Sequence, residues 1–437
     1  MLSIPMMGRC GFLVSVRTSF LDSEILTIFL GASSGFSIAS SYGSKWLGDQ
    51  WHTGGWRLAA QRHAHRWQLA SWFPRILQDN FERRSFQPLP SKADTMHLID
   101  ESFGKYNKAI PLFNESSFMR LVQRQFSWNP DERPSWWASF NVVLAFGYME
   151  RAQKSPDGSD NMQKSLGHIK NALNVVVELF MRTADILAAQ ALLSLALFFQ
   201  RTPNPQPLFM FAVAAMRLSQ SMGLHRANTF GFSPAEVEER RRTFWVAFIL
   251  DADISVRTGR PSVQDVKDFD VPLPSKTPQD DLGIITIDGV RFNYFHILAE
   301  FALVQRQMHR HLYTATAFKK SGENLIREIN RCKEVLLEWS KSFPEQFRPH
   351  RDFPSANHDL LPHVLRLHLA YHCCFAKLYH ICVLTQQSVN RQSHNIVDIE
   401  SLNRKLTDCI IASLESARSA VKLIDNVSVI DNDFFPW

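Results

Sequence analysis

The chain has 437 residues, of which 45% are hydrophobic and 21% are charged, so it is long enough to bury one large core or two smaller ones. This composition excludes a chain that is disordered throughout. The 33 phenylalanines against 18 glycines favour long packed helices over a turn-rich β-sandwich. The net charge of +6 is spread along the whole chain, so it permits an acidic partner without indicating a nucleic-acid-binding face.

The six cysteines exclude a disulfide framework and a structural zinc site. None stands in a C-x-x-C pair, and only Cys10 precedes Cys332. Structural zinc needs four closely spaced Cys or His ligands. We therefore expect a reducing compartment, the cytosol or the nucleus.

Residues 1–93 are expected to form an irregular N-terminal arm. The uncharged residues 25–44 are marginal as a membrane span because their second half is rich in Gly, Ala and Ser, so a buried core segment is the preferred interpretation. Tryptophans beside basic residues could stack bases and contact phosphates, and the candidate nucleic-acid contacts are Arg57, Arg62, Arg66 and Trp67. Because nothing organises these side chains into a known motif, docking of the arm on the main body is favoured.

Residues 94–437 are expected to form one helical domain. Asp94 or Thr95 is a candidate N-cap for its first helix, and Asn114 is a candidate start for the second. Apolar residues at three- and four-residue spacing predict further helices, and no segment shows the sustained alternation of a strand. The expected ranges are 162–181, 184–200, 207–222, 233–257, 290–312, 319–341, 360–386 and 397–424.

The predicted fold is all-α, a multi-helical array of antiparallel helical hairpins around a central apolar helix. Short links between the helices in the middle of the chain imply the antiparallel hairpins. The helix over 360–386 is apolar nearly all round, which predicts the central core helix; a wall of a ligand pocket or a dimer face are the alternatives.

Residues 223–274 carry most of the information. Gly223 stands where a left-handed residue would end one helix. Ser233 and Pro234, followed by Glu236, have the residue types that begin the next helix. Gly259 and Pro261 then stop that helix.

A carboxylate is expected on the apolar face of this helix. Asp251 lies on nearly the same side as Arg240, with apolar residues between them. Because a buried carboxylate is costly unless it is paired, we predict an ion-pair joint in which Asp251 pairs with Arg240, Arg260 or Arg226. Acid–base chemistry at Asp251 or His225 is the alternative, and no second catalytic group stands at a telling spacing.

An ordered set of residues marks this stretch: Gly223, Leu224, His225, Arg241, Arg242, Phe244, Trp245, Gly259, Pro261, Asp270 and Pro272. Gln190-Ala-Leu192 and residues 30–35 extend the set upstream. Together they resemble the fungal-specific transcription factor domain, which is the middle homology region of fungal zinc binuclear-cluster transcription factors. The likeness is detailed over 94–275 and looser toward the C-terminus, and the ordered set is specific where no single tripeptide is.

This resemblance implies an all-helical region that regulates transcription in the nucleus, with the cytoplasm as the second location. It implies contacts with the transcriptional machinery or co-regulator proteins, in a homodimer or a heterodimer, and no membrane. Typical members also carry a six-cysteine cluster spaced C-x2-C-x6-C, which this chain lacks. We therefore expect no zinc or other cofactor, DNA contact that is only indirect or weak, and a truncated C-terminus at Trp437.

The alternative function is a small-molecule-sensing helical protein derived from such a factor. An enzyme is not expected. Residues 31–35 match G-x-S-x-G and the run before them could be a strand, but a nucleophile elbow at Ser33 needs an α/β sheet that nothing else indicates. His368 and His372 stand one helical turn apart, and because a metal needs a third ligand from elsewhere, no metal site is predicted.

Overall fold

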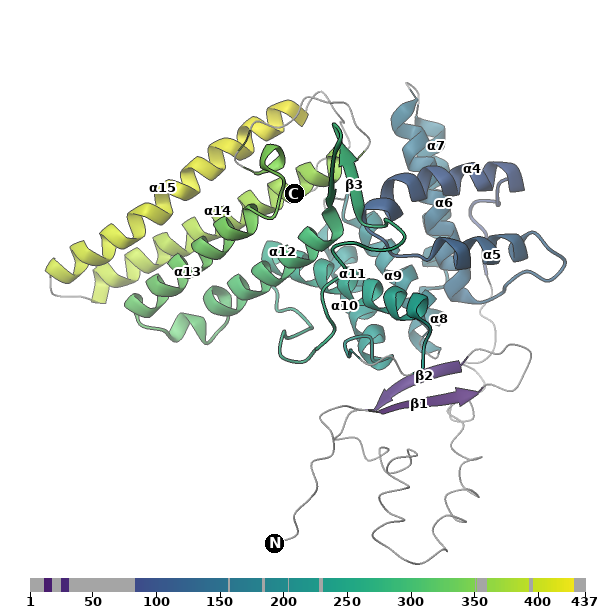
Figure 1. Ribbon diagram of the computed structural model, residues 1–437, viewed down its shortest axis with the longest axis horizontal. Coiled ribbons are helices and arrows are strands. Elements are labelled where there is room, and N and C mark those ends of the chain that lie inside the picture. Colours follow the sequence, from purple (N-terminus) through teal and green to yellow (C-terminus); the bar gives the residue numbers. More distant parts are fainter. Residues whose placement is uncertain are drawn as a thin grey trace, which may run out of the picture.

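The computed structural model describes residues 12–17, 25–30, 83–155, 158–182, 185–202, 204–227, 231–349, 351, 360–392 and 396–427. Over these residues the fold is almost entirely helical, which confirms the predicted class (Figure 1). Two short antiparallel hairpins interrupt the helical pattern.

The first part of the domain folds around one hydrophobic cluster. Its centre is a long helix, α6, which contacts α4, α7 and α9 and buries Trp136 and Phe140 completely. The elements in this part are α4 (Lys92–Ser102), the π-helical turn η4 (Phe103–Asn107), α5 (Glu115–Gln125), α6 (Pro134–Lys154), α7 (Ser159–Leu173), α8 (Val176–Met181), α9 (Ile186–Phe199), α10 (Pro205–Ser221) and α11 (Pro234–Thr258).

The second part folds around another cluster. Its long helices α13, α14 and α15 contact one another and form the elongated end of the molecule in Figure 1. The elements are β3 (Ile284–Ile287), β4 (Val290–Asn293), α12 (Tyr294–Met308), the π-helical turn η5 (His309–Tyr313), the 3-10 turns η6 (Ala317–Lys319) and η7 (Glu345–Phe347), α13 (Gly322–Ser340), α14 (Leu361–Gln392) and α15 (Ile396–Val427).

Helix α12 belongs to both clusters because it has two apolar faces. Phe295, Ala299 and Ala302 stand three or four residues apart and enter the first cluster. Ile297 and Phe301 point into the second cluster from the other side of the helix. The two clusters therefore share a seam along α12, and the helices α11 and α14 also meet there.

The helix predicted over 290–312 begins four residues too early. Residues 290–293 are strand β4, which pairs with β3 so that Ile285 lies opposite Phe292. Asp288 (φ 50°) and Gly289 (φ 77°) make the turn between the strands. Two consecutive positive φ angles at Asp-Gly are typical of a type I′ hairpin turn, and these short strands carry too little alternation to reveal the hairpin otherwise.

A second hairpin lies in the N-terminal arm, which was predicted to be irregular apart from a possible strand just before residues 31–35. β1 (Phe12–Arg17) pairs antiparallel with β2 (Ile25–Leu30), and β2 lies against α10. This two-stranded hairpin is not the α/β sheet that a nucleophile elbow requires. Ser33 itself and the candidate nucleic-acid contacts Arg57, Arg62, Arg66 and Trp67 lie outside the described residues.

Most helix ends follow the local signals in the sequence. Asn114 caps α5 by accepting the N–H of Ser117, as predicted. The first helix is capped by Ser91 and not by Asp94 or Thr95, because the Ser91 hydroxyl accepts the Asp94 N–H. The single helix predicted over 162–181 is two helices, α7 and α8, which are separated by a turn at residues 174–175.

Candidate functional site

Helix α11 is the central element of residues 223–274, and the rest of this stretch packs against it. Its start is a full capping box: the Ser233 side chain accepts the Glu236 N–H, and the Glu236 carboxylate accepts the Ser233 N–H. Its end is Gly259 in the left-handed conformation, with φ 71°. Before it, Gly223 closes α10 with φ 71°, and the N–H of Leu224 reaches back to the Ser219 carbonyl, which is a Schellman motif. These ends are the ones that the sequence predicted.

Asp251 is completely buried in the middle of α11. Its carboxylate accepts the backbone N–H groups of Val263 at 3.0 Å and Gln264 at 3.3 Å, which holds the loop after Gly259 against the helix. Burial raises the pKa of Asp251, while the Gln264 amide and the positive charge of Arg306 on α12 oppose that rise. Arg306 also donates to the Gln264 carbonyl at 3.0 Å.

The predicted ion-pair joint is therefore wrong in its pairing. Among the described residues Asp251 forms no ion pair with Arg240, Arg260 or Arg226. The hydrogen-bond donors to the Asp251 carboxylate are backbone amides of the loop, not a cationic side chain. The positive charge that acts on Asp251 comes from Arg306, which lies outside residues 223–274.

Each of the three predicted arginines joins different elements. Arg240 donates to the Met222 carbonyl at 2.7 Å and lies over the Phe232 ring, so it ties α11 to the end of α10. Burial lowers the pKa of Arg240 to about 10. Arg226 pairs with Asp270 at 3.8 Å. Arg260 donates to the Gln206 side chain at 3.0 Å, at the start of α10.

The next two arginines bind acids at the outer edge of the segment. Arg241 contacts Glu238 at 2.9 Å. Arg242 contacts Glu238 as well and makes two parallel hydrogen bonds to the Asp280 carboxylate, at 2.7 and 2.8 Å. Such a bidentate pair fixes both position and orientation, so it fastens α11 to the chain before β3.

An aromatic cluster closes the other face of this joint. Phe244 and Trp245 are fully buried, and their rings pack at 5.1 and 5.7 Å from the ring of Phe269. The indole N–H of Trp245 donates to the Pro272 carbonyl at 2.7 Å. The residues that resemble the fungal-specific transcription factor domain therefore hold residues 259–274 against α11 by packing and hydrogen bonds.

The geometry favours a structural role for Asp251 and His225 over acid–base chemistry. The Asp251 oxygens are occupied by backbone amides, and burial, assisted by Arg226, lowers the pKa of His225 to about 4. The pair His368 and His372 is divided between different partners, the Phe347 carbonyl and the Ser416 hydroxyl. No group of three or more His, Cys, Asp or Glu side chains suited to a metal occurs in the part of the chain that the structure describes.

A cavity lies where the first part of the domain meets the first turns of α14. It is an open hollow, and the space of about 670 Å³ between its walls includes bulk solvent. One wall is formed by the π-helical turn η4 and the residues after it, others by α6 and α9, and the last by the first turns of α14. We call this space the seam cavity; a second hollow of about 530 Å³ shares His363 and Arg366 with it.

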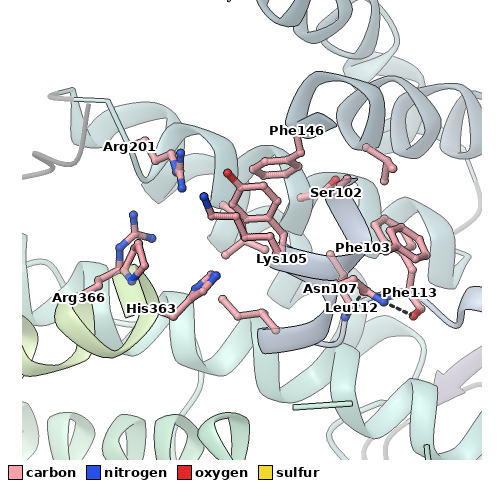
Figure 2. A pocket seen from close by; sticks show the side chains of 16 residues that line it. Ser102, Phe103, Lys105, Asn107, Leu112, Phe113, Phe146, Arg201, His363 and Arg366 are labelled. Carbon is pink, nitrogen blue, oxygen red and sulfur yellow. Dashed lines mark hydrogen bonds between the residues drawn. The ribbon is translucent and has the colours of Figure 1, made fainter. Parts of the chain in front are cut away.

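Cationic side chains from both parts of the domain line the seam cavity. Figure 2 shows Lys105 and Arg201 on one side, facing His363 and Arg366 of α14. Lys105 pairs with Glu150 at 2.7 Å, behind the wall. These residues are far apart along the chain and form no motif, so the sequence does not reveal this site. A pocket wall was one predicted alternative for the helix over 360–386.

None of the described helices combines the length and hydropathy that crossing a bilayer requires. A family model described as the fungal specific transcription factor domain matches residues 105–410. The chain is 39% identical to an ABC-transporter-regulating transcription factor of Aspergillus oryzae and 38% identical to one of Aspergillus fumigatus, each over 91% of this chain. It is 30% identical, over 72% of its length, to the fusaridione A cluster transcription factor of Fusarium heterosporum.

The chain spans only part of each of these relatives. The matched region is 45% of the length of each Aspergillus protein and 59% of the Fusarium protein. No solved structure matches the chain.

Proposed function

This chain belongs to the fungal specific transcription factor domain family, and from that membership we propose that it works in the nucleus as the helical regulatory region of a transcription factor. It acts through contacts with co-regulator proteins or the transcriptional machinery, and it is not an enzyme. Zinc and other cofactors play no part in this proposal, and DNA contact by this region is indirect or weak.

The observation that carries the proposal is the extent of the family match. It runs from η4 to the middle of α15, and so covers nearly all of the described helical domain. Within it, the residues that first suggested the family form a packed joint with no free acid–base pair, which suits a regulatory module better than a catalyst. The small-molecule-sensing alternative is not favoured as the main function, because the relatives are named as transcription factors.

The names of the Aspergillus relatives suggest the genes to measure first. Both are described as regulating ABC transporters. We extend this role to the chain as a proposal: transcripts of ABC transporter genes are expected to change when its gene is deleted and to return when the gene is restored.

Tethering the chain to DNA tests the regulatory role directly. The chain is fused to an unrelated DNA-binding domain, and a reporter gene with the matching binding sites is measured. Expression is expected to rise or fall relative to the DNA-binding domain alone. Trp245→Ala should abolish the change because Trp245 is buried in the joint, whereas Trp128→Ala should retain it because that side chain is 94% exposed.

Reporter expression that does not respond to the wild-type fusion, at nuclear levels matched by immunoblot, would contradict the proposal. An unchanged response in the Trp245→Ala fusion would also contradict it, since the effect would then not require the folded domain.

A further inference from the structure

We propose that the outward side of helices α7 and α8 docks an acidic amphipathic helix of a co-regulator protein. This inference rests on the proposed regulatory role, to which it adds the place and the chemistry of one protein contact. Five apolar side chains form the surface, which we call the α7–α8 face: Leu166, Leu173, Val177, Phe180 and Met181. Its exposure, its shape and the charge along its border support the proposal.

The α7–α8 face is exposed although its side chains are large and apolar. Leu166 is 47% exposed, Val177 53% and Phe180 46%. Other residues of the two helices fill the first hydrophobic cluster, where Ile169 and Leu179 are buried. The domain therefore packs without the exposed side chains, and neighbouring apolar side chains left in solvent mark an interaction surface.

Helical spacing arranges these side chains along one line. Leu166 and Leu173 are two turns apart on α7, and Val177 and Phe180 stand on adjacent turns of α8. Both helices pack on α6 with their buried sides, so both exposed groups face away from α6. At 1.5 Å per residue, residues 166–181 extend over about 22 Å, which matches about four turns of a partner helix.

Residues 83–87 form one edge of the α7–α8 face, because they run beside both helices. The Phe86 N–H donates to the Asn171 side chain of α7 at 2.7 Å, and Arg83 lies 4.0 Å from Glu178 of α8. The Phe86 ring is exposed, and Arg84 lies over it at 5.1 Å. This edge therefore adds an aromatic ring and a positive charge to the border of the face.

The acids of α7 and α8 are already paired with cations. Asp160, in the first turn of α7, pairs with Lys164 at 2.6 Å. Glu178 is buried, and it contacts Arg182 at 2.8 Å as well as Arg83. Neither helix therefore offers an unpaired carboxylate to a basic partner.

Two cations beside the α7–α8 face are available to an acidic partner. Lys170, between Leu166 and Leu173 on α7, is exposed, and so is Arg84; neither forms an ion pair within the described part of the chain. A second copy of the chain, or residues 57–75 with their four arginines and no acid, would set like charges against one another. An acidic amphipathic helix brings carboxylates to these cations and covers the apolar side chains.

Three labelled peptides test the charge preference. Each is an amphipathic helix of about 18 residues with leucine and phenylalanine on one side. On the other side alanine alternates with glutamate, glutamine or lysine. Fluorescence anisotropy measures the binding of each peptide to the purified full chain. The glutamate peptide should bind about tenfold more tightly than the glutamine peptide, the lysine peptide should bind most weakly, and added salt should weaken binding of the glutamate peptide.

Two variants and a matched control locate the binding. Val177→Asp puts a carboxylate in the middle of the face and should weaken binding of the glutamate peptide by about tenfold or more. Lys170→Glu should narrow the difference between the glutamate and lysine peptides by about tenfold. Val421→Asp is the control: this valine is 59% exposed on α15, so the same substitution should leave binding unchanged. The unfolding midpoint shows that each variant folds, and the exchange at exposed Lys170 keeps the test decisive if Val177→Asp does not.

The tethered reporter separates this contact from the regulatory role. The Val177→Asp fusion should lose most of the change in expression, and the Val421→Asp fusion should retain it. If the wild-type and Val177→Asp fusions respond equally, the α7–α8 face is not the contact, although the regulatory role stands. A silent wild-type fusion would contradict the regulatory role, and the anisotropy measurement would still decide whether the face binds an acidic helix.

Equal binding of the three peptides would overturn the proposal, because the face would then have no charge preference. Absence of binding by every peptide would overturn it as well. Binding of the glutamate peptide that persists in both Val177→Asp and Lys170→Glu would place the site elsewhere. A dimer that dissociates in Val177→Asp, measured by sedimentation, would show that a second copy of the chain occupies the face.

Discussion

Asp251 sits fully buried on α11 with its carboxylate turned to the backbone N–H groups of Val263 and Gln264. Asp251→Asn puts an amide donor against those donors, so we expect it to lower the free energy of unfolding by about 2–3 kcal/mol. Arg260→Gln changes a partly exposed contact to Gln206 and should cost less than about 1 kcal/mol. Urea denaturation of both variants measures these values.

The double variant separates the observed geometry from the predicted ion pair. Because Asp251 and Arg260 share no contact, their effects should add within about 0.5 kcal/mol. A larger coupling energy would mean that the two charges do interact and that the predicted pair exists in solution.

The burial of Asp251 could be predicted because helical periodicity places it on an apolar face. Its partners could not, since the donors are the backbone amides of a loop, and the sequence says nothing about the path of a loop. The charge that acts on Asp251 belongs to Arg306, which is 55 residues further along the chain on α12. Such a pairing is fixed by the packing of α12 on α11.

The sequence predicted the ends of the helices better than any other feature of the secondary structure, and α11 shows why. Its cap residues act on neighbours within four positions, so the expected range 233–257 agrees closely with Pro234–Thr258. Strands β3 and β4 were missed because their pairing needs only four residues each. The Asp288-Gly289 dipeptide was the one local signal for this hairpin. The positive φ angles of both residues identify it as the turn between the two strands.

The C-terminal glycine of α11 gives a test at this scale. Gly259 has φ 71°, and an added Cβ would meet no atom within 4 Å, so the cost of Gly259→Ala is conformational alone. We expect about 1–2 kcal/mol of destabilisation, measured by urea denaturation. Gly104 is the matched control: it also has open space around a Cβ but no positive φ, so Gly104→Ala should be neutral or slightly stabilising. Equal effects at both sites would contradict the left-handed cap.

At the scale of the whole molecule, the sequence predicted the fold class but not the seam. The fold class can be predicted from the spacing of apolar residues, because that spacing is present within the sequence of each single helix. The seam cavity arises where η4, α9 and α14 meet, and its cations lie at positions 105, 201 and 366. No spacing rule joins residues so far apart, so the cavity could be found only in three dimensions.

The shared helix α12 implies that the two clusters unfold together. Phe295 is buried in the first cluster, and Phe301 packs in the second at 4.4 Å from the Trp339 ring. Phe295→Ala and Phe301→Ala should each cost about 3–5 kcal/mol and shift one common transition. Hydrogen exchange in denaturant is the measurement: α6 and α14 should lose protection at the same urea concentration in every variant.

A matched control is Leu337→Ala on α13, whose side chain is 38% exposed and should barely move the transition. If α13, α14 and α15 lost protection at a lower urea concentration than α6, the two clusters would unfold as independent units. That result would contradict cooperative unfolding through α12.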